Sequence, residues 1–365
     1  MTTTSPSSSP DHRPALVGLS PAEIETALAP FGQPAFRPRQ IYKWIHHHGV
    51  TDFAEMTNLP KPLRESLAET FRLTTLTLNT RRISQDGTRK YLWRLDSGRD
   101  IESVFIPEAT RTTICISSQV GCSLGCRFCA TAQMGFLQNL TPGEIVEQVL
   151  AVQRDTGTDI TNVVLMGMGE PFLNYPRVIA ACRILNDPEG TAISAKKITI
   201  STVGIVPRIR QFAAEQQPFS LAISLHAAKQ ELRSSIMPVA DKFGVEELMA
   251  SAREYTNLTG KRITFEYVLL AGVNDRPEDA RALLKVLSRL RCKLNLIPYN
   301  DTSLGFAIPD EARLTAFLEP LRSAPFSVTV RKNRGTDIAA ACGQLFAEQN
   351  ATRPARYLHA PTPTS

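Results

Sequence analysis

Three cysteines stand close together in the segment Cys122-Ser-Leu-Gly-Cys126-Arg-Phe-Cys129. Thiolates are the ligands that zinc and iron–sulfur clusters favour in proteins. A structural zinc site needs four ligands, and no nearby Cys or His completes this set. Three thiolates on one loop instead suit a 4Fe–4S cluster, because they leave one iron open for another ligand. A zinc site with a distant fourth ligand and three buried free cysteines are the alternatives.

Polar residues follow four apolar runs that we predict to be strands. The run at 162–166 leads into Gly167-Met-Gly-Glu-Pro171, where glycines allow close backbone approach and Glu170 can pair with an ammonium group. Each polar residue also has a plainer role open to it, as a turn residue, a solvated carboxylate or a structural histidine. Their recurrence beside the cysteine loop favours one ligand pocket. The other three strand ends are Ser201-Thr-Val-Gly204, Ser224-Leu-His226 and Leu296-Ile-Pro-Tyr-Asn300.

The elements that must position these residues begin at Thr112. Short apolar runs alternate with amphipathic helices there, which predicts a parallel sheet with helices outside. The first helix has a capping signal, with Thr141, Pro142 and Glu144 in order. Six or seven such units fit an open barrel or a doubly wound sheet, and the pattern alone does not separate the two. The predicted strands are 112–117, 162–166, 197–201, 220–225, 263–269, 292–297 and 326–330.

The chain before Thr112 has a different pattern. Helical apolar spacing covers 16–72, with a capping signal at Ser20 and Glu23. Short alternating runs then surround Asp86-Gly87 and Ser97-Gly98, which predicts β-hairpins. The first residues are rich in Ser, Thr and Pro, and lack the basic start and apolar stretch of a secretion signal.

Composition narrows the class of protein. The chain has 365 residues, 42% of them apolar, with no apolar run long enough to span a membrane. Its net charge of +6 permits a polyanionic partner without indicating one strongly. Seven cysteines, an odd number, argue against a disulfide framework and favour metal or redox chemistry. We therefore expect a cytoplasmic protein that makes no contact with a membrane.

The Cys-x3-Cys-x2-Cys spacing resembles that of the radical S-adenosylmethionine superfamily. A closer resemblance, to the RlmN methyltransferases, rests on the ending Arg334-Gly-Thr-Asp-Ile-Ala-Ala-Ala-Cys-Gly-Gln-Leu345, on Gly-Met-Gly-Glu-Pro and on the Glu102 segment Ile-Glu-Ser-Val-Phe-Ile-Pro. It implies an α/β fold, namely a partial (β/α)6 barrel with an N-terminal helical accessory domain and a short β-hairpin segment. It also implies that the protein forms 2-methyladenosine in 23S rRNA and in tRNAs.

The resemblance further implies cofactors, partners and domains. One 4Fe–4S cluster per chain and two S-adenosylmethionine molecules per turnover would be used. A small protein such as flavodoxin or ferredoxin would supply electrons, and the chain would be a monomer. The expected parts are a disordered tail at 1–15, an RNA-binding helical domain at 16–72, a β-hairpin extension at 73–110, the core barrel at 111–345 and a loose tail at 346–365.

Roles for individual residues follow from the same resemblance. Cys122, Cys126 and Cys129 would hold the cluster. Seven residues at the strand ends would line the S-adenosylmethionine site: Gly169, Glu170, Ser201, Ser224, Leu225, His226 and Asn300. Cys342 would take a methyl group from one S-adenosylmethionine, and a radical made from a second would remove a hydrogen from that methyl group. The resulting methylene radical would add to carbon 2 of adenine.

Two more residues would then release the product. Cys115 would attack the sulfur of Cys342 to form a disulfide, and Glu102 would take the carbon 2 proton. By residue type alone, both cysteines fit equally well as small buried apolar residues. Because a thiolate is the reactive form, we expect Cys342 to be accessible and its pKa to be lowered by a nearby cation such as Arg331, Lys332 or Arg334.

Basic and aromatic residues at 36–44 suit phosphate pairing and base stacking, although a helix with a solvated basic face explains them equally well. We expect Ile41 and Trp44 to lie in the core, and we assign no function to the run His46-His47-His48. Further phosphate-binding candidates surround the first hairpin: Arg81, Arg82, Arg89 and Lys90.

Two positions depart from the family pattern, with Ala132 in place of an expected Gly and Asp301 in place of an expected Pro. Two other functions remain open. A relative that methylates carbon 8 of the same adenosine and confers antibiotic resistance shares the cluster and both reactive cysteines. A non-catalytic iron–sulfur RNA-binding protein would need the cysteine triplet, but not Cys115, Cys342 or Glu102.

Overall fold

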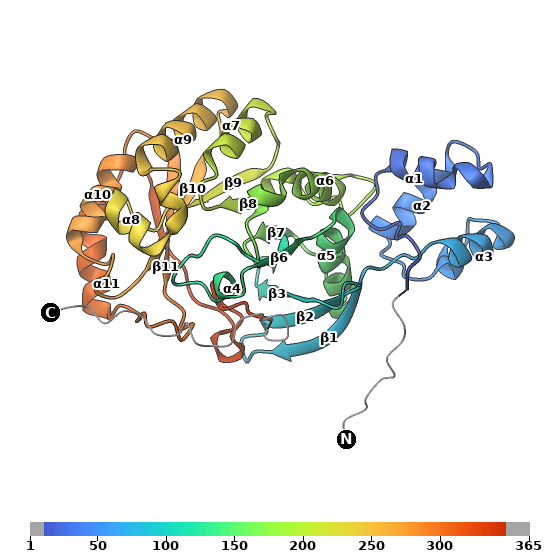
Figure 1. The fold of residues 1–365 in the computed structure, drawn as a ribbon, viewed down its shortest axis with the longest axis horizontal. Helices are drawn as coiled ribbons and strands as arrows, with labels where there is room; N and C mark the ends of the chain where they lie inside the picture. The colour runs from blue at the N-terminus through green and yellow to red at the C-terminus, as the bar shows by residue number, and fades with distance from the viewer. Residues whose placement is uncertain (1–10, 348–365) are drawn as a thin grey trace, which may run out of the picture.

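The computed structural model describes residues 11–347, so the tails predicted at 1–15 and 346–365 lie largely outside the described residues. At the N-terminal end, α1 (Pro21–Leu28), α2 (Arg37–His46) and α3 (Lys61–Thr70) form a small helical body to one side of the chain (Figure 1). The predicted capping box starts α1, because the Glu23 amide donates to the Ser20 hydroxyl and the Ser20 amide donates to the Glu23 carboxylate.

The rest of the chain is built on one sheet of ten strands. Three strands, β1 (Leu76–Ile83), β2 (Arg89–Leu95) and β3 (Asp100–Glu108), pair antiparallel and join β4 (Arg111–Cys115). From β4 onward all neighbouring pairs are parallel, and β1 and β12 form the two edges. The remaining strands are β7 (Asn162–Leu165), β8 (Ile198–Thr202), β9 (Ser220–Ser224), β10 (Ile263–Leu269), β11 (Cys292–Pro298) and β12 (Ser327–Val330).

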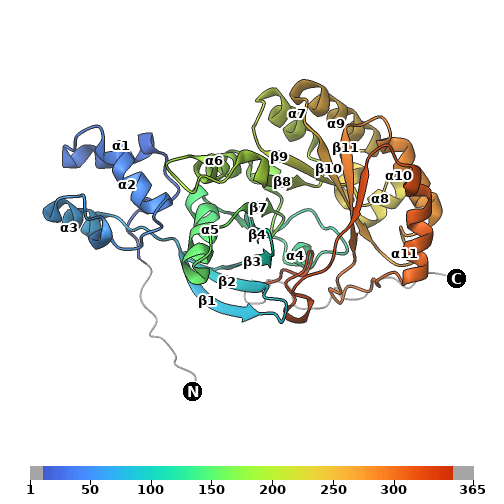
Figure 2. The same ribbon diagram turned by 180° about the vertical axis from the view of Figure 1, so that it is seen from behind.

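Helices cover the outside of this curved sheet, as the two opposite views show (Figures 1 and 2). They are α5 (Pro142–Thr156), α6 (Tyr175–Asn186), α7 (Val206–Ala214), α8 (Gln230–Ile236), α9 (Val245–Thr259), α10 (Pro277–Leu287) and α11 (Glu311–Leu318). The parallel strand order, with helices on the outside of the sheet, confirms the predicted α/β fold and the open barrel. The parallel strands are buried by helices on the outside, which is why they read as apolar runs in the sequence.

A second, two-stranded sheet was not predicted from the sequence. β5 (Gln119–Gly121) pairs antiparallel with β6 (Phe136–Asn139), and the cysteine loop and the short helix α4 (Ala130–Gln133) lie between them. Gly121 has a φ of +71° and lies so close to Gly135 that a Cβ would be 1.8 Å from the Gly135 carbonyl oxygen. This hairpin therefore closes the base of the cysteine loop. Its strands are too short for a periodic signal.

The chain after β12 runs back across the barrel, and we call residues 331–347 the C-terminal segment. It bonds to the hairpin strands, where the Ser84 hydroxyl donates to Asp337 and the Lys90 ammonium donates to the Ala339 carbonyl. It also bonds to α4, since the Ala130 amide donates to the Gly343 carbonyl at 2.8 Å. These contacts join parts of the chain that are about 200 or more residues apart in sequence, which the sequence pattern alone did not reveal.

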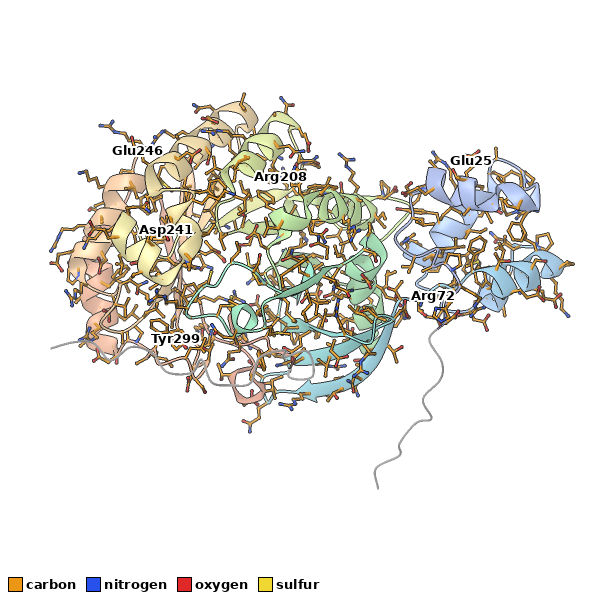
Figure 3. All side chains as sticks on the ribbon, viewed as in Figure 1. Glu25, Arg72, Arg208, Asp241, Glu246 and Tyr299 are labelled. Carbon is orange, nitrogen blue, oxygen red and sulfur yellow. The ribbon has the colours of Figure 1, made fainter. Side chains whose placement is uncertain are left out.

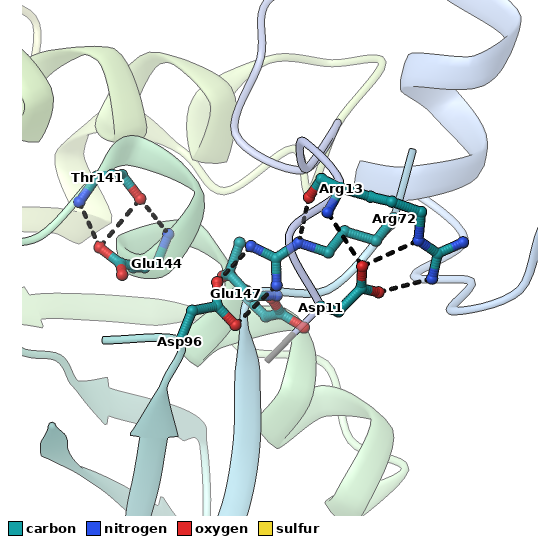
Figure 4. A network of polar contacts seen from close by, with 8 residues as sticks. Asp11, Arg13, Arg72, Asp96, Thr141, Glu144 and Glu147 are labelled. Atoms are coloured by element: carbon teal, nitrogen blue, oxygen red, sulfur yellow. Dashed lines mark hydrogen bonds and ion pairs between the residues drawn. The ribbon is translucent and has the colours of Figure 1, made fainter. Parts of the chain in front are cut away.

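The helical body is joined to the barrel by a polar junction (Figure 4). Arg72 donates to the Arg13 carbonyl and to Asp96, which follows β2, and Thr75 donates its hydroxyl to the buried carboxylate of Glu147 in α5. Figure 3 labels Arg72 at this neck between the two parts. No helix among residues 11–347 is long and apolar enough to cross a membrane.

Two glycines bring the helical body against the start of α5. A Cβ on Gly18 would lie 2.1 Å from the Gly143 nitrogen, so only glycine fits at this contact. The Gly18 amide donates to Nε2 of His46, whose burial lowers its pKa to about 4 and keeps the ring neutral at physiological pH. His46 therefore acts in the structure as a buried acceptor.

Gly18→Ala should lower the free energy of unfolding by about 1–3 kcal/mol more than Gly32→Ala does, because the added methyl overfills the contact with Gly143. Gly32 is a matched control, since it also has a positive φ, of +56°, but a Cβ added there would meet no atom within 4 Å. Urea denaturation of both variants measures the difference. Equal losses would mean that the contact between Gly18 and Gly143 contributes nothing.

Candidate active site

The cysteine loop, residues 122–129, is held at both ends by backbone hydrogen bonds. The Cys122 amide donates to the Gly135 carbonyl at 2.9 Å, and the Cys129 amide donates to the Cys126 carbonyl at 3.2 Å. A third bond joins the loop to the barrel, because the Arg127 amide donates to the Ile236 carbonyl at the end of α8. The loop is thus fixed over the carboxyl ends of the parallel strands, where this architecture places its chemistry.

Cys126 is buried and Cys122 and Cys129 are half-buried, and the three thiols are close enough to influence one another. Burial raises the pKa of Cys122 to about 12 and also raises the pKa values of Cys126 and Cys129. Mutual repulsion between the thiolates adds to the effect at Cys122 and Cys126. Buried thiols of this kind ionise when a metal centre binds them, because its positive charge outweighs the burial.

All three loop thiols face one cavity at the mouth of the barrel. Five of the seven predicted strand-end residues line this cavity: Gly169, Glu170, Ser201, Ser224 and His226. Leu225 and Asn300 lie outside its wall. Tyr299, labelled in Figure 3, lines the cavity from the end of β11. The parallel strands therefore bring residues spread over more than one hundred positions into a single pocket with the cysteine loop.

Glu170 bridges two strand ends at this pocket. Its carboxylate accepts hydrogen bonds from the amides of Phe172 at 3.0 Å and Val203 at 2.9 Å, and its own amide donates to Gln119. Burial raises the pKa of Glu170 to about 7. A cation beside this carboxylate would favour its ionised form.

His226 adopts a left-handed backbone conformation, with a φ of +56°. Its Nδ1 accepts a hydrogen bond from the Val268 amide at 3.0 Å, and its ring meets Phe128 edge to face at 5.0 Å. Burial and the charge of Arg233 lower the pKa of His226 to about 3, so the ring is neutral. The amide of Leu225 donates to the Glu266 carbonyl, which holds this strand end against β10.

Asn300 ties the C-terminal segment to the end of β11. Its side-chain nitrogen donates to the Cys342 carbonyl at 3.2 Å. Its side-chain oxygen is buried and has no hydrogen-bond partner among the described residues. A buried acceptor without a donor is costly, so this oxygen fits a ligand that carries donors, such as a hydroxyl or an ammonium group.

Cys342 lies in the wall between two cavities. It lines the larger cavity with the loop thiols, and it lines a smaller one with Cys115, Met166 and Arg331. Cys115 is the last residue of β4, directly before the chain turns toward the cysteine loop. The structure thus brings together two cysteines that are more than two hundred residues apart in sequence.

The electrostatics at these cysteines differ from the expected ones. Burial raises the pKa of Cys342 to about 11 and that of Cys115 to about 12. Arg331 lowers both pKa values, as expected of a nearby cation, but burial outweighs it. The prediction of a net lowering at Cys342 is therefore wrong. The side chain is half-buried rather than open to solvent.

Glu102 is buried in β3 beneath the C-terminal segment. Its carboxylate pairs with the Lys90 ammonium at 2.7 Å and accepts from the Phe346 amide at 2.8 Å. Burial raises its pKa, and Lys90 opposes this rise. Glu102 does not line either cavity, but Lys90 also donates to the Ala339 carbonyl, so the pair contacts the segment that carries Cys342.

Two charged residues near the pocket were missed by the sequence analysis. Glu266 stands in the middle of β10 and lines the larger cavity, where Arg331 and Asn295 oppose the rise in its pKa that burial causes. A carboxylate inside an apolar parallel strand was a signal that could have identified it. Arg233 in α8 had no such signal, because arginine is common on amphipathic helices.

The basic candidates around the first hairpin are partly engaged within the protein. Arg81 and Arg89 pair with Asp155, and Lys90 pairs with Glu102. In the helical body Ile41 is buried as expected, whereas Trp44 is only partly buried and donates its indole N–H to Asn58. Phe36 is 55% exposed beside the Arg37 guanidinium, so it remains available for a contact.

The two departures from the family pattern lie on either side of the C-terminal segment. Ala132, in α4, lines the larger cavity. The Asp301 carbonyl accepts from the Gln344 side chain at 2.7 Å. Ala132 therefore forms part of the pocket wall, whereas Asp301 contacts the segment that carries Cys342.

The residues present fit a 4Fe–4S cluster and S-adenosylmethionine. The cluster would find three soft thiol donors on one glycine-bearing loop at the wall of a cavity. S-adenosylmethionine would find a buried carboxylate for its ammonium group at Glu170 and an unpartnered acceptor at Asn300. Within residues 11–347, no three His, Cys, Asp or Glu side chains converge tightly enough to hold a single metal ion.

Comparisons with known proteins agree with this geometry. Residues 116–284 match the radical SAM superfamily, and residues 15–73 match the ribosomal RNA large subunit methyltransferase N-terminal domain. A crystal structure of a radical SAM methyltransferase from Sphaerobacter thermophilus superposes with a TM-score of 0.87 at 46% identity, covering 91% of this chain and 99% of that chain. The fold and site thus define a radical S-adenosylmethionine enzyme, a class that uses a 4Fe–4S cluster and S-adenosylmethionine.

Sequence relatives narrow the class to one family. The dual-specificity RNA methyltransferase RlmN of Anaeromyxobacter dehalogenans is 44% identical, covering 95% of both chains. That of Syntrophobacter fumaroxidans is 46% identical, covering 89% of this chain and 96% of the relative. The chain belongs to the RlmN family of RNA methyltransferases, which confirms the resemblance drawn from its motifs.

Arg331→Met should slow alkylation of Cys342 by iodoacetamide at pH 8, by about tenfold for each unit by which the thiol pKa rises. The thiolate reacts, and removing the cation lowers its population. In the parent protein the rate should increase with pH until it approaches the pKa of about 11. Peptide mass spectrometry of the reduced, metal-free protein measures the rate at each thiol.

Cys292 is the internal control for this experiment. Its pKa is also about 11, and burial is the only cause of the rise. Its alkylation rate should therefore stay the same in both proteins. If the alkylation rate changes equally at both cysteines, or does not change at Cys342, then Arg331 does not influence the Cys342 thiol.

Proposed function

We propose that this protein methylates carbon 2 of an adenosine in 23S rRNA and in tRNAs. The observation that carries the proposal is the position of Cys342, which shares one cavity with the three loop cysteines and a second with Cys115. A methyl carrier needs access to a radical source on one side and to a resolving thiol on the other. The RlmN names of the relatives support the same activity.

Carbon 2 of adenine requires unusual chemistry because it is electron-poor and does not attack a methyl donor. When bound by Cys122, Cys126 and Cys129, the cluster supplies the electron that splits S-adenosylmethionine and creates a carbon radical. The other steps belong to the chain. The Cys342 thiolate takes a methyl group from a first S-adenosylmethionine by displacement, which releases S-adenosylhomocysteine. The carbon radical made from the second S-adenosylmethionine takes one hydrogen atom from that methyl group, and the methylene carbon then adds to carbon 2 of adenine.

Product release depends on a second thiol and a base. Glu102 takes the proton from carbon 2, and the unpaired electron of the adduct would return to the bound cluster. Cys115 then attacks the Cys342 sulfur, so that a sulfur–sulfur bond forms as the sulfur–carbon bond to the RNA breaks. The freed carbon keeps the electron pair of that bond and takes a proton, which completes the methyl group. Burial raises the pKa of Glu102, which makes its carboxylate a stronger base than an exposed one.

S-adenosylmethionine is held by the seven strand-end residues. Glu170 pairs with its ammonium group, and Asn300 offers the buried oxygen. Gly169 adds close backbone approach, since its φ of +99° suits only glycine. The set is completed by Ser201, Ser224, Leu225 and His226. One cluster per chain and two S-adenosylmethionine molecules per turnover satisfy this scheme.

The remaining parts of the chain hold the RNA and receive electrons. The helical domain at 16–72 contacts RNA through exposed basic and aromatic residues such as Phe36 and Arg39, and the hairpin extension at 73–110 adds Arg82. The target adenosine enters the pocket from a loop or after flipping out of its stack. The protein acts as a cytoplasmic monomer, and flavodoxin or ferredoxin reduces the cluster.

Cys115→Ala should accumulate a covalent adduct between protein and RNA, because Cys342 still transfers its carbon but no thiol releases the product. Cys342→Ala should give neither adduct nor 2-methyladenosine. Denaturing gel electrophoresis after nuclease-free incubation measures the adduct. Cys182→Ala, at a buried thiol inside α6 that lines neither cavity, is the control and should retain activity. Full activity of Cys342→Ala would contradict the proposed methyl transfer through Cys342 and release by Cys115.

The reconstituted protein tests which carbon of adenine is methylated and which RNA is the substrate. The cluster is assembled without oxygen, and rRNA fragments or tRNA are added with S-adenosylmethionine and a reductant. Mass spectrometry of the digested RNA should detect 2-methyladenosine from both substrates. 8-Methyladenosine instead would identify the carbon 8 activity, and absence of both methylated bases and of 5′-deoxyadenosine would favour the non-catalytic RNA-binding protein.

A further inference from the structure

Arg233 in α8 is completely buried, and its guanidinium donates only to backbone carbonyls among the described residues. Nε donates to the Leu225 carbonyl at 3.0 Å, and Nη1 donates to the Phe243 carbonyl at 3.3 Å. Nη2 donates to the carbonyls of Val203 and Ser224, at 2.5 and 3.4 Å. Within residues 11–347, no carboxylate contributes to its charge environment. The guanidinium is therefore held firmly by neutral groups.

A buried cation without a counter-ion is costly, so an anion is expected nearby. The contacts at the end of α8 indicate where such an anion would lie. The Ile236 carbonyl at its end accepts from the Arg127 amide of the cysteine loop, and Met237 lines the larger cavity. Once ionised, Cys126 is the group whose charge favours the Arg233 cation. Arg233 also lowers the pKa of His226, whose ring is neutral, so of these two groups only Cys126 can become an anion.

We propose that Arg233 is a positioning residue that supplies a fixed positive charge to the 4Fe–4S cluster and raises the cluster's reduction potential. This inference rests on the proposed function, because it requires the cluster to be held by the cysteine loop. Arginine suits this position for two reasons. Its N–H donors satisfy more carbonyls than a neutral side chain would, and it also brings a positive charge.

The physical effect follows from the charge of the two redox states. A 4Fe–4S cluster held by three thiolates carries negative charge, and it gains one more when an electron arrives from the protein reductant. A nearby cation in a poorly screened interior stabilises the more negative state more strongly. Arg233 keeps its proton in both states and forms no bond to the cluster. Its carbonyl partners prevent the side chain from moving away from the loop.

The test measures the cluster's reduction potential rather than methylation. The full chain is reconstituted without oxygen, and the potential is determined by redox titration followed by electron paramagnetic resonance. S-adenosylmethionine is left out, so that changes at the strand ends that Arg233 also holds do not contribute. Arg233→Gln removes the charge and keeps hydrogen-bond donors, whereas Arg233→Lys keeps the charge. Arg210→Gln removes an exposed charge from α7 and is the control for net charge.

Arg233→Gln should shift the potential to a more negative value, while Arg233→Lys and Arg210→Gln should stay near the parent. An unshifted potential in a fully loaded Arg233→Gln protein would overturn the proposal, as would an equal negative shift in Arg233→Lys. If Arg233→Gln does not fold or load, Arg233→Lys decides: a potential near the parent supports the charge role, and a negative shift contradicts it.

The outcome is separate from that of the proposed function. A parent protein that assembles no cluster or forms no methyladenosine would fail the proposed function itself. If the parent protein does both, but its reduction potential does not respond to the charge at position 233, only the proposed role of Arg233 is contradicted.

Discussion

The site depends on the hydrogen bonds that hold the C-terminal segment against the cysteine loop. The Ala130 amide donates to the Gly343 carbonyl, the Thr131 hydroxyl donates to the Leu345 carbonyl, and Asn300 donates to the Cys342 carbonyl. Each bond contributes about 1 kcal/mol to stability, but together they fix the position of one sulfur between two cavities. They act together with the bonds that Ser84, Lys90 and Glu102 make to the same segment.

Burial is the second constraint, and it sets the charge state of nearly every group at the pocket. It raises the pKa values of Glu102, Glu170 and Glu266 and those of the thiols, and it lowers the pKa of His226. The protein places two arginines in this poorly solvated region. Arg331 lines the smaller cavity with Cys115 and Cys342, and Arg233 lies toward the cysteine loop. Ionised thiolates and a reduced cluster are the states that such cations stabilise.

The helical body is joined to this core by contacts that leave little room for independent movement. Gly18 touches Gly143 at the start of α5, and Arg72 reaches Asp96 beyond the end of β2. If the helical body binds RNA as proposed, these contacts would present that RNA to the barrel in a restricted orientation. The same α5 carries Gln148, which bonds to both the amide and the carbonyl of Ser117 just before the cysteine loop.

The sequence by itself determined the local features. Ser20 and Thr141 marked helix starts, apolar runs marked the parallel strands within two residues, and the spacing of Cys122, Cys126 and Cys129 predicted a loop for a cluster. These features follow from propensity and periodicity, which act over a few residues. Family motifs added Cys115, Cys342 and Glu102.

Only the tertiary structure decided how distant groups meet and what charge they carry. It closed the loop with the β5–β6 hairpin, placed Cys342 beside Cys115, and brought Glu266 and Arg233 into the same region. It also overturned the expected lowering of the Cys342 pKa, since burial outweighed Arg331. The physical reason is that burial and electrostatic interactions depend on every neighbour in space, whereas sequence patterns register only neighbours along the chain.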